Sequence, residues 1–405
     1  MKPRIASSMS ELRYTPKRYE LPFPLSEYKD RLRRVREAME RAGVDVVVMD
    51  DPQDLHWLTG TRVEKEQTRG DNQLIIWDGD PIMVVRHLEA SAHKYSSWID
   101  NWLEYLDEGP VNPYDPMKKV AEALKEHGLD RKKIGLNFRV VTLYNHRRLK
   151  DLVPNAEIRD FRVENIRIIK SKLEQDCQFK AAKVNQDALM ATINEMQIGW
   201  SQQEIEDSVA RYHAKYLGSD YEETRILCMI GQDLLQMHRL VRGAEKREAK
   251  IRKGDIVYIE PGAFVKRYAG TMIRMISFGE PPAHVRKSCE ASIEALNRAI
   301  AATAPGRTSH EVDKASRDYF AKMGLDCQGR IGYSCGIDWA EGGVMSIEPN
   351  NPLVLVPGHI FHYISINFLP GWGYMGVSEQ VLVTEDGHEV LADRDRTCER
   401  NLCVK

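Results

Sequence analysis

One carboxylate stands in an apolar segment of the second half of the chain. Glu260 follows the apolar run IVYI in GDIVYIEPGA, which predicts a buried strand. An ionised carboxylate in such a strand costs several kcal/mol unless it is paired or functional. We therefore expect Glu260 to be catalytic, either as a nucleophile or as a base for water. A structural ion pair with Arg267 or Arg274 is the alternative.

Two histidines are suited to work beside such a carboxylate. His238 lies in the loop DLLQMHRLVRG, and imidazole titrates near neutral pH, which suits a proton shuttle to a leaving nitrogen. His362 is two residues beyond Ile360, so strand alternation places both side chains on one face. With Tyr333, His362 is expected to hydrogen-bond substrate oxygens. The alternatives are a surface or core position for His238 and ordinary packing for His362.

Three more acidic residues are candidates for binding a substrate. Glu379 lies just before VLVTEDG and is expected to hold a cationic amidine or guanidine group through a charge-assisted pair. Asp338 and Glu341, both in DWAEGG, are either pocket acids or turn and cap residues.

Length and composition limit the class of protein. The chain has 405 residues, which predicts two domains with separate cores, and its net charge of -2 gives no reason to expect a nucleic-acid partner. No apolar run reaches the roughly 18 to 20 residues of a membrane span, and the N-terminus does not resemble a signal peptide. The seven cysteines include no CxxC pair, which argues against a disulfide framework and a zinc ribbon. We expect a cytoplasmic protein without membrane contact.

The first half of the chain predicts an α/β domain over residues 25–168, after a polar arm over 1–24. SEYKDRLRRVREAMERAG has helical spacing with a Ser cap and a Gly stop, and VDVVVMD predicts a buried strand. A hairpin around residues 78–80, a helix in PMKKVAEALKEHGLD and a strand in KIGLN follow. The alternation of helices and strands is typical of layered α/β packing.

The second half predicts an α+β domain over residues 169–395, with a tail over 396–405. Helices are expected at 172–197, 202–217, 283–303 and 308–324, and strands within 225–279 and 331–391. The charged run VRGAEKREAKIRKG is expected to be a solvated loop or helix end.

The order of several segments supports a family resemblance. DDPQDLHWLTG, IIKSKLEQDCQFKAAKVNQDALMA, KGDIVYIEPGA, GRIGYSCGIDWAEGG and LVPGHIFHYIS, followed by SEQVLVTEDGHEVL, resemble the pita-bread family of creatinases, Xaa-Pro aminopeptidases and prolidases over about residues 25–393. The resemblance implies an α/β N-terminal domain followed by an α+β pita-bread catalytic domain. It also implies that Trp57 packs near the site, often from the partner subunit, although a core position is the alternative.

The metal-dependent members of that family hold two metal ions with five ligands, two Asp, one His and two Glu. By resemblance these positions fall on Glu260, Thr271, Tyr333 and Ile364, and on Ser378, or Glu379 if the frame slips by one. Two hard cations that lie close together need several anionic oxygens. We therefore expect no metal and no cofactor, and count Thr271 among residues that line the substrate site.

The family also contains metal-free hydrolases, namely creatinase and the ectoine hydrolases. Creatinase places a Glu before the Arg of the second strand, whereas Ile273 precedes Arg274 here. The pattern resembles ectoine hydrolases more closely, through Glu260 and the pairs listed last: Arg267-Tyr268, Gly332-Tyr333, Asp338-Trp339, Phe361-His362 and Trp372-Gly373, with Glu379. By this resemblance His238 is the active-site histidine and Arg274 orients Glu260. The loop between Gly336 and Asp338 is shorter than in ectoine hydrolases, so the identity of the substrate stays open.

These patterns predict a metal-independent hydrolase that cleaves a non-peptide C–N bond in a small polar or zwitterionic solute. By resemblance the protein is a homodimer with its active site near the subunit interface. A catalytically silent pita-bread binding module is the first alternative. A metal-dependent Xaa-Pro dipeptidase or lyase is the second.

Overall fold

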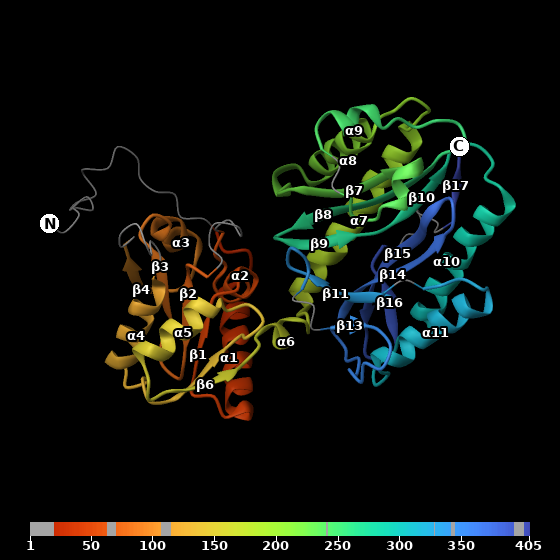
Figure 1. Ribbon diagram of the computed structural model, residues 1–405. Coiled ribbons are helices and arrows are strands. Elements are labelled where there is room, and N and C mark those ends of the chain that lie inside the picture. The colour runs from red at the N-terminus through yellow and green to blue at the C-terminus, as the bar shows by residue number, and fades with distance from the viewer. Residues whose placement is uncertain are drawn as a thin grey trace, which may run out of the picture. The chain divides into compact units, whose positions relative to one another are not determined.

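The computed structural model describes residues 20–62, 70–106, 115–239, 242–327, 329–341, 345–392 and 401–405 (Figure 1). The chain divides into two compact units, Met1–Arg167 and Ile168–Lys405. Within the described ranges, no helix has both the length and the apolar character needed to cross a bilayer.

The first unit is a six-stranded mixed sheet with helices packed on it. Its strands run in the order β4-β3-β2-β1-β5-β6. The strands are β1 (Val46–Met49), β2 (Gln73–Ile76), β3 (Ile82–Arg86), β4 (Asn101–Tyr105), β5 (Lys133–Leu136) and β6 (Glu157–Asp160). The helices are α1 (Leu25–Ala42), α2 (Pro52–Thr59), α3 (Ala90–Ser96), α4 (Pro116–Glu126), α5 (Leu143–Leu152) and α6 (Glu164–Arg167).

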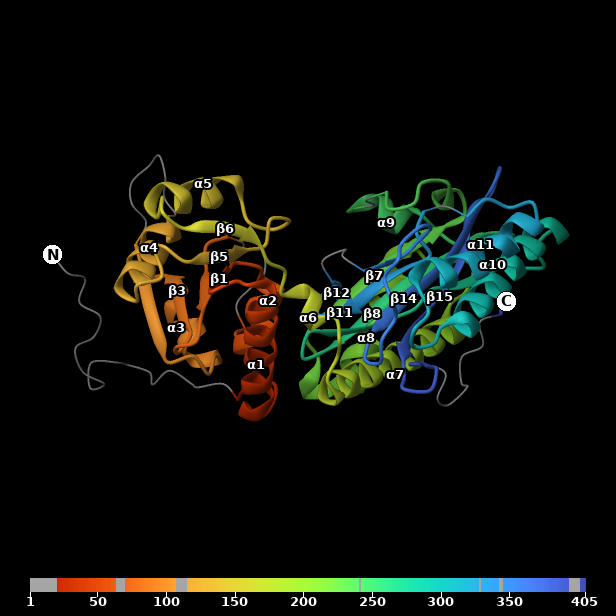
Figure 2. The ribbon, with the colours of Figure 1, turned by 90° about the horizontal axis from the view of Figure 1, so that it is seen from below.

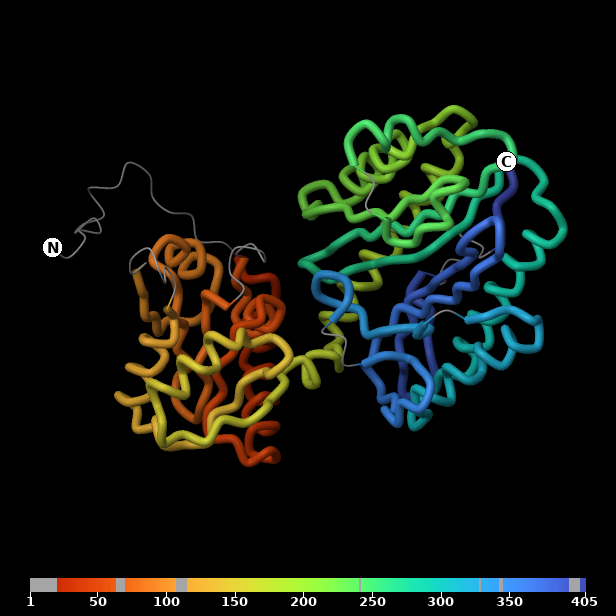
Figure 3. The backbone as a smooth tube through the Cα atoms, viewed as in Figure 1, coloured from red at the N-terminus to blue at the C-terminus, as the bar shows by residue number. Residues whose placement is uncertain are grey.

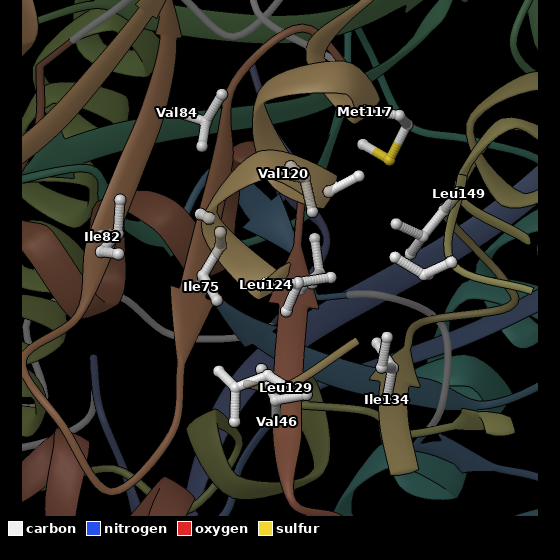
Figure 4. Close-up of a cluster of buried hydrophobic side chains, with 14 of the residues drawn as sticks. Val46, Ile75, Ile82, Val84, Met117, Val120, Leu124, Leu129, Ile134 and Leu149 are labelled. Atoms are coloured by element: carbon white, nitrogen blue, oxygen red, sulfur yellow. The ribbon is translucent and has the colours of Figure 1, made fainter. Parts of the chain in front are cut away.

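The core of this unit lies between the sheet and helix α4. Val120 and Leu124 of α4 contact a cluster that includes Val46, Ile75 and Ile134 from three neighbouring strands (Figure 4). The expected hairpin is present, because β2 and β3 pair in antiparallel fashion. One detail was wrong: helix α1 starts after Pro24 without a side-chain cap, so the Ser in its first turn is not the cap residue.

The second unit contains two curved sheets and two pairs of long helices (Figures 1 and 2). One sheet has the order β17-β10-β8-β7 with β9 paired to β8, and the other has the order β12-β11-β14-β15-β16 with β13 paired to β11. The strands are β7 (Thr224–Ile230), β8 (Ile256–Val265), β9 (Tyr268–Thr271), β10 (Arg274–Ser277), β11 (Gly332–Gly336), β12 (Trp339–Ala340), β13 (Ser346–Ile347), β14 (Ile360–Leu369), β15 (Gly373–Val383), β16 (His388–Val390) and β17 (Cys403–Val404). The helices are α7 (Lys172–Glu195), α8 (Gln202–Leu217), α9 (Ala244–Glu248), α10 (Ala283–Ala302) and α11 (Ser309–Lys322), with short 3-10 turns η2 (Gly218–Asp220) and η3 (Gly231–Leu235).

Capping boxes define where three of the long helices begin. Ser171, Ser201 and Thr308 each accept a hydrogen bond from the backbone three residues on, where a glutamate returns the contact. Helices α7 and α8 pack on β8 through one apolar cluster, and α10 and α11 pack on β14 and β15 through another. The tube in Figure 3 shows that these segments, far apart in sequence, form one layered unit.

The two sheets of this unit meet at a bridge between Ile273 and Ser378. Strand β17 extends the first sheet by pairing in parallel with β10. The expected C-terminal tail is therefore partly a strand of the second unit. The expected charged run contains the exposed helix α9.

Candidate active site

Glu260 lies at the centre of β8, a strand in which every residue is buried. Its side chain has two described neighbours. The Tyr258 hydroxyl is 3.5 Å from Oε2, and Nδ1 of His362 is 4.0 Å from Oε1. The expected alternative of an ion pair with an arginine does not form, because Arg267 pairs with Asp338 and Arg274 pairs with Glu379.

Burial controls the charge of this carboxyl group. Desolvation raises the pKa of Glu260 to about 8, and the hydrogen bond from Tyr258 offsets it only in part. The group is 7% exposed. Near neutral pH this buried carboxyl is therefore mostly protonated. So large a shift is unusual for a glutamate and is often found at functional sites.

Tyr333, His362 and Ser378 form a chain of hydrogen bonds beside Glu260. The Tyr333 hydroxyl is 2.9 Å from Nδ1 of His362, and Nε2 of His362 is 2.6 Å from Oγ of Ser378. The register explains this contact, because Tyr333 of β11 stands opposite His362 of β14. Desolvation lowers the pKa of His362 to about 3, so the ring is neutral at physiological pH.

Trp339 completes this chain, although it was noted only as part of the Asp338-Trp339 pair and was assigned no role. Its indole Nε1 donates to the Tyr333 hydroxyl at 2.9 Å, and its ring lies over Gly262, where a Cβ atom would come within 2.2 Å of Cζ3. Asp338 and Trp339 have φ angles of 57° and 89°. Such angles are rare for bulky residues and mark a constrained backbone, which is the feature that singles out Trp339.

The structure does not bring Glu379 to this cluster. On β15 it stands opposite Tyr363, whose side chain packs toward α10 and α11, whereas Ser378 stands opposite Ile364. Glu379 and Ser378 thus lie on opposite faces of the strand. The Glu379 carboxylate accepts a hydrogen bond from Arg274 at 2.5 Å, and the side chains are only 2% and 3% exposed.

Arg274 also donates to the carbonyl oxygens of Ile273 and Ser378. It therefore ties the two sheets together at their bridge. The described neighbours of Glu260 are Tyr258 and His362, so no contact between Arg274 and Glu260 supports the role expected for Arg274, that of orienting Glu260.

Asp338 and Glu341 are both held by cations. Asp338 accepts two hydrogen bonds from Arg267, at 2.9 and 2.5 Å. Glu341 forms a fully buried pair with Lys170 and also accepts from Ser334 and the backbone of Ile337. These contacts favour a structural role for Asp338 and Glu341 over a role in binding substrate, since they hold the loop that carries Trp339.

Three expected residues are not members of the hydrogen-bonded chain. His238 is exposed in a turn after η3, with φ of 62°. Trp57 belongs to the first unit, where it is fully buried and its backbone oxygen accepts from Arg31. Thr271 ends β9 opposite Gly262, and its backbone N–H donates to Gln380. Among the described residues, the buried Thr271 hydroxyl has no hydrogen-bond partner.

A six-stranded α/β unit followed by a unit of two curved sheets with a carboxyl-bearing site defines the pita-bread class of two-domain proteins. Residues 31–169 match the creatinase/prolidase N-terminal domain, and residues 176–385 match metallopeptidase family M24. The chain belongs to metallopeptidase family M24.

Relatives of more than one activity resemble the whole chain. An ectoine hydrolase from Halomonas elongata is 27% identical over 398 residues, which cover 93% of this chain and 98% of that protein. A Xaa-Pro dipeptidase from Pyrococcus furiosus is 24% identical over 375 residues, which cover 91% of this chain and 99% of that protein. The solved dipeptidase PepE from Mycobacterium ulcerans superposes with a TM-score of 0.81 at 23% identity, covering 94% of this chain and 99% of that one.

The family name implies bound metal, and a pair of metal ions needs several anionic oxygen ligands. At the positions that correspond to ligands in metal-dependent members, this chain has one carboxyl group, Glu260, the hydroxyls of Thr271, Tyr333 and Ser378, and the apolar Ile364. Across the part of the chain that the structure describes, no group of three or more His, Cys, Asp or Glu side chains is placed to hold a metal ion. These residues do not fit a two-metal site.

Proposed function

We propose that the chain is a hydrolase that opens a non-peptide C–N bond of a small zwitterionic solute, such as a cyclic amidine, without a metal ion. Glu260 is the reacting carboxyl group. The observation that carries the proposal is that the described groups around Glu260 are neutral hydroxyl and imidazole groups, with no second carboxyl group described among them. The full-length similarity to an ectoine hydrolase supports the substrate class.

The charge of the substrate would determine the charge of Glu260. When no cation lies beside Glu260, burial favours its protonated form. An amidinium cation beside it lowers its pKa and restores the carboxylate. A neutral peptide has no such effect. The site is therefore suited to a cationic reacting group, and the carboxylate forms where that cation is bound.

Two reaction courses are consistent with this arrangement. In the first, a Glu260 oxygen bonds to the amidine carbon, the C=N electron pair moves to nitrogen, and the C–N bond then breaks as the leaving nitrogen takes a proton. Water releases the acylated Glu260 and supplies the new carbonyl oxygen. In the second, Glu260 takes a proton from water as the water oxygen attacks the same carbon, and passes that proton to the leaving nitrogen as the C–N bond breaks. Both courses consume one water molecule.

The two courses differ in a covalent intermediate. Acid quenching within one turnover, followed by intact-mass measurement, detects the adduct if Glu260 is the nucleophile. With a cyclic amidine the protein gains the mass of the whole solute, because the leaving nitrogen stays attached to the opened ring. The mass stays unchanged if Glu260 is a base. Glu260→Gln serves as the control in both cases, because it cannot form the ester.

The proposal is tested on protein treated with a chelator and assayed against ectoine, creatine and Gly-Pro. We expect C–N opening of an amidine-type substrate without added metal, and its loss in Glu260→Gln. Cleavage of Gly-Pro that depends on added Mn²⁺ or Zn²⁺ would instead identify a dipeptidase. Failure to hydrolyse any of the three, with no binding of them, would favour a silent binding module.

A further inference from the structure

We propose that the chain from Trp339 through Tyr333 and His362 to Ser378 is directional, and that it leaves the hydroxyl groups of Ser378 and Thr271 as free donors for a negatively charged oxygen of the substrate. This inference rests on the proposed function for the identity of the substrate. It assigns an anion-binding role to two positions at which metal-dependent relatives carry ligands.

The direction follows from counting donors and acceptors. The indole Nε1 of Trp339 can only donate, so the Tyr333 oxygen accepts there. Donation into the phenol oxygen makes its O–H a stronger donor. The remaining described contact of that hydroxyl is Nδ1 of His362, 2.9 Å away. Tyr333 therefore donates to Nδ1.

A neutral imidazole carries one N–H, so an acceptor at Nδ1 requires the proton to be on Nε2. Nε2 then donates to Oγ of Ser378 at 2.6 Å. The opposite direction would place two N–H donors on the phenol oxygen of Tyr333, which is a weaker acceptor than a serine oxygen. In the direction proposed here, the hydroxyl hydrogen of Ser378 has no described acceptor.

Thr271 supplies the second donor. It stands directly opposite Gly262 in an antiparallel pair, so both positions project to the same face. The Trp339 ring covers Gly262 on that face, and Glu260 is two residues before Gly262, so it projects there too. The Thr271 side chain is 1% exposed, and its hydroxyl has no hydrogen-bond partner within the described ranges.

Thr271 carries an unpartnered hydroxyl on the face that carries Glu260, and Ser378 carries the free hydroxyl hydrogen at the end of the chain that contains His362, a neighbour of Glu260. Both attract an anionic oxygen, because a buried polar hydrogen is costly until it is bonded. That oxygen is either a carboxylate oxygen of the substrate or the water-derived oxygen that becomes the new carbonyl group. The first source predicts an effect on KM, and the second predicts an effect on kcat.

The direction of the chain is measured on the full-length protein labelled with ¹⁵N-histidine. We expect the His362 signals, assigned with His362→Gln, to show a neutral ring protonated at Nε2. Trp339→Phe keeps a ring but removes the indole donor, and is expected to weaken this preference. A ring protonated at Nδ1 would overturn the proposal, and this result does not depend on any hydrolytic activity.

The donor role is measured by titrating acetate and ectoine while following the His362 Nε2 signal, with 2-methyl-1,4,5,6-tetrahydropyrimidine as the amidine that lacks a carboxylate. Ser378→Ala and Thr271→Val are expected to reduce carboxylate affinity or kcat by roughly 10- to 100-fold each. Ser365→Ala is the matched control, because it removes another buried hydroxyl without a described partner, on the opposite face of β14.

Equal affinity for the probes with and without carboxylate, together with unchanged kcat in both variants, would overturn the donor role. If no amidine is hydrolysed but acetate shifts the His362 signal in the wild type and not in Ser378→Ala, the anion site stands and the proposed function fails. If the amidine is hydrolysed and neither variant differs from Ser365→Ala, the proposed function stands and the anion site fails.

Discussion

Oε1 of Glu260 lies 4.0 Å from Nδ1 of His362, yet the two groups are not an ion pair near neutral pH. Burial raises the pKa of the Glu260 carboxyl to about 8 and lowers the pKa of the His362 ring to about 3. Between these values the carboxyl keeps its proton and the ring lacks its second one. The pair is therefore neutral over a wide range of pH.

Stability should fall as pH rises from about 4.5 to about 8 because of Glu260. Its pKa is about 8 when folded and near 4.5 when unfolded, so between these values the folded state binds the extra proton. The free energy of unfolding then decreases as pH rises through this window, by up to about 1.4 kcal/mol per pH unit. We expect Glu260→Gln to have a higher Tm than the wild type at pH 8.5 and a similar Tm at pH 5, as measured by thermal melts. An equal difference at both pH values would contradict this.

The rate should report the same ionisation. If Glu260 acts as nucleophile or base, kcat/KM of the free enzyme rises with pH through an apparent pKa near 8. Glu260→Gln should lower kcat/KM by about two to four orders of magnitude and abolish its rise with pH near 8. The measurement is a pH–rate profile with an amidine substrate. A rate that falls across this range would show that the protonated carboxyl is the active form.

The buried pair of Arg274 and Glu379 should contribute to stability. Glu379→Ala removes the carboxylate that pairs with the buried Arg274 guanidinium. Breaking a buried pair in this way lowers the free energy of unfolding by about 3–5 kcal/mol. The double variant Arg274→Met with Glu379→Leu should be less destabilised than the sum of the single variants. Urea denaturation measures both.

Kinetics on Glu379→Gln separate this role from the substrate-binding role expected from the sequence. A loss of stability with nearly normal KM supports the ion pair. A large rise in KM at unchanged Tm would restore Glu379 as a residue that holds the substrate.

Gly262 should be required for the position of Trp339. In Gly262→Ala the new Cβ would lie 2.2 Å from the indole, so the half-buried ring has to move away from the Tyr333 hydroxyl. We expect kcat/KM to fall by about tenfold or more while the Tm changes little, because losing one such hydrogen bond costs about 0.5–1.5 kcal/mol and the altered chain adds to this. Gly387→Ala is the control, since nothing lies within 4 Å of its Cβ position. Unchanged kinetics in Gly262→Ala would show that Trp339 has no part in catalysis.

The sequence indicated that Glu260 is a buried carboxyl group, and the structure shows this burial. A carboxyl group in the apolar run before Pro261 can only be buried in a strand, and burial is what raises its pKa. Tyr333 and His362 were expected to bind substrate oxygens together; the structure hydrogen-bonds the two side chains to each other, and their contact with a substrate stays a prediction. The long helices of the second unit follow from their periodicity and from their capping boxes.

Other features depend on contacts that no local pattern contains. Ser378 and Glu379 are neighbours in sequence, and only the pairing of β15 with β14 decides which of them shares a face with Ile364. Trp339 reaches the site because Gly262, in a distant segment, leaves room for its ring. Short elements such as α3 and β6 have too few residues to show a period.

The placement of Trp339 gives the molecule an optical reporter of its own. The half-buried indole touches the Tyr333 hydroxyl and lies within 6.3 Å of the His362 ring, measured between ring centres. A solute that binds beside Glu260 is expected to change the polarity around this ring and so to shift its emission. Because the chain has seven tryptophans, the shift is assigned by its loss in Trp339→Phe. Occupancy can thus be followed by light, before any product is formed.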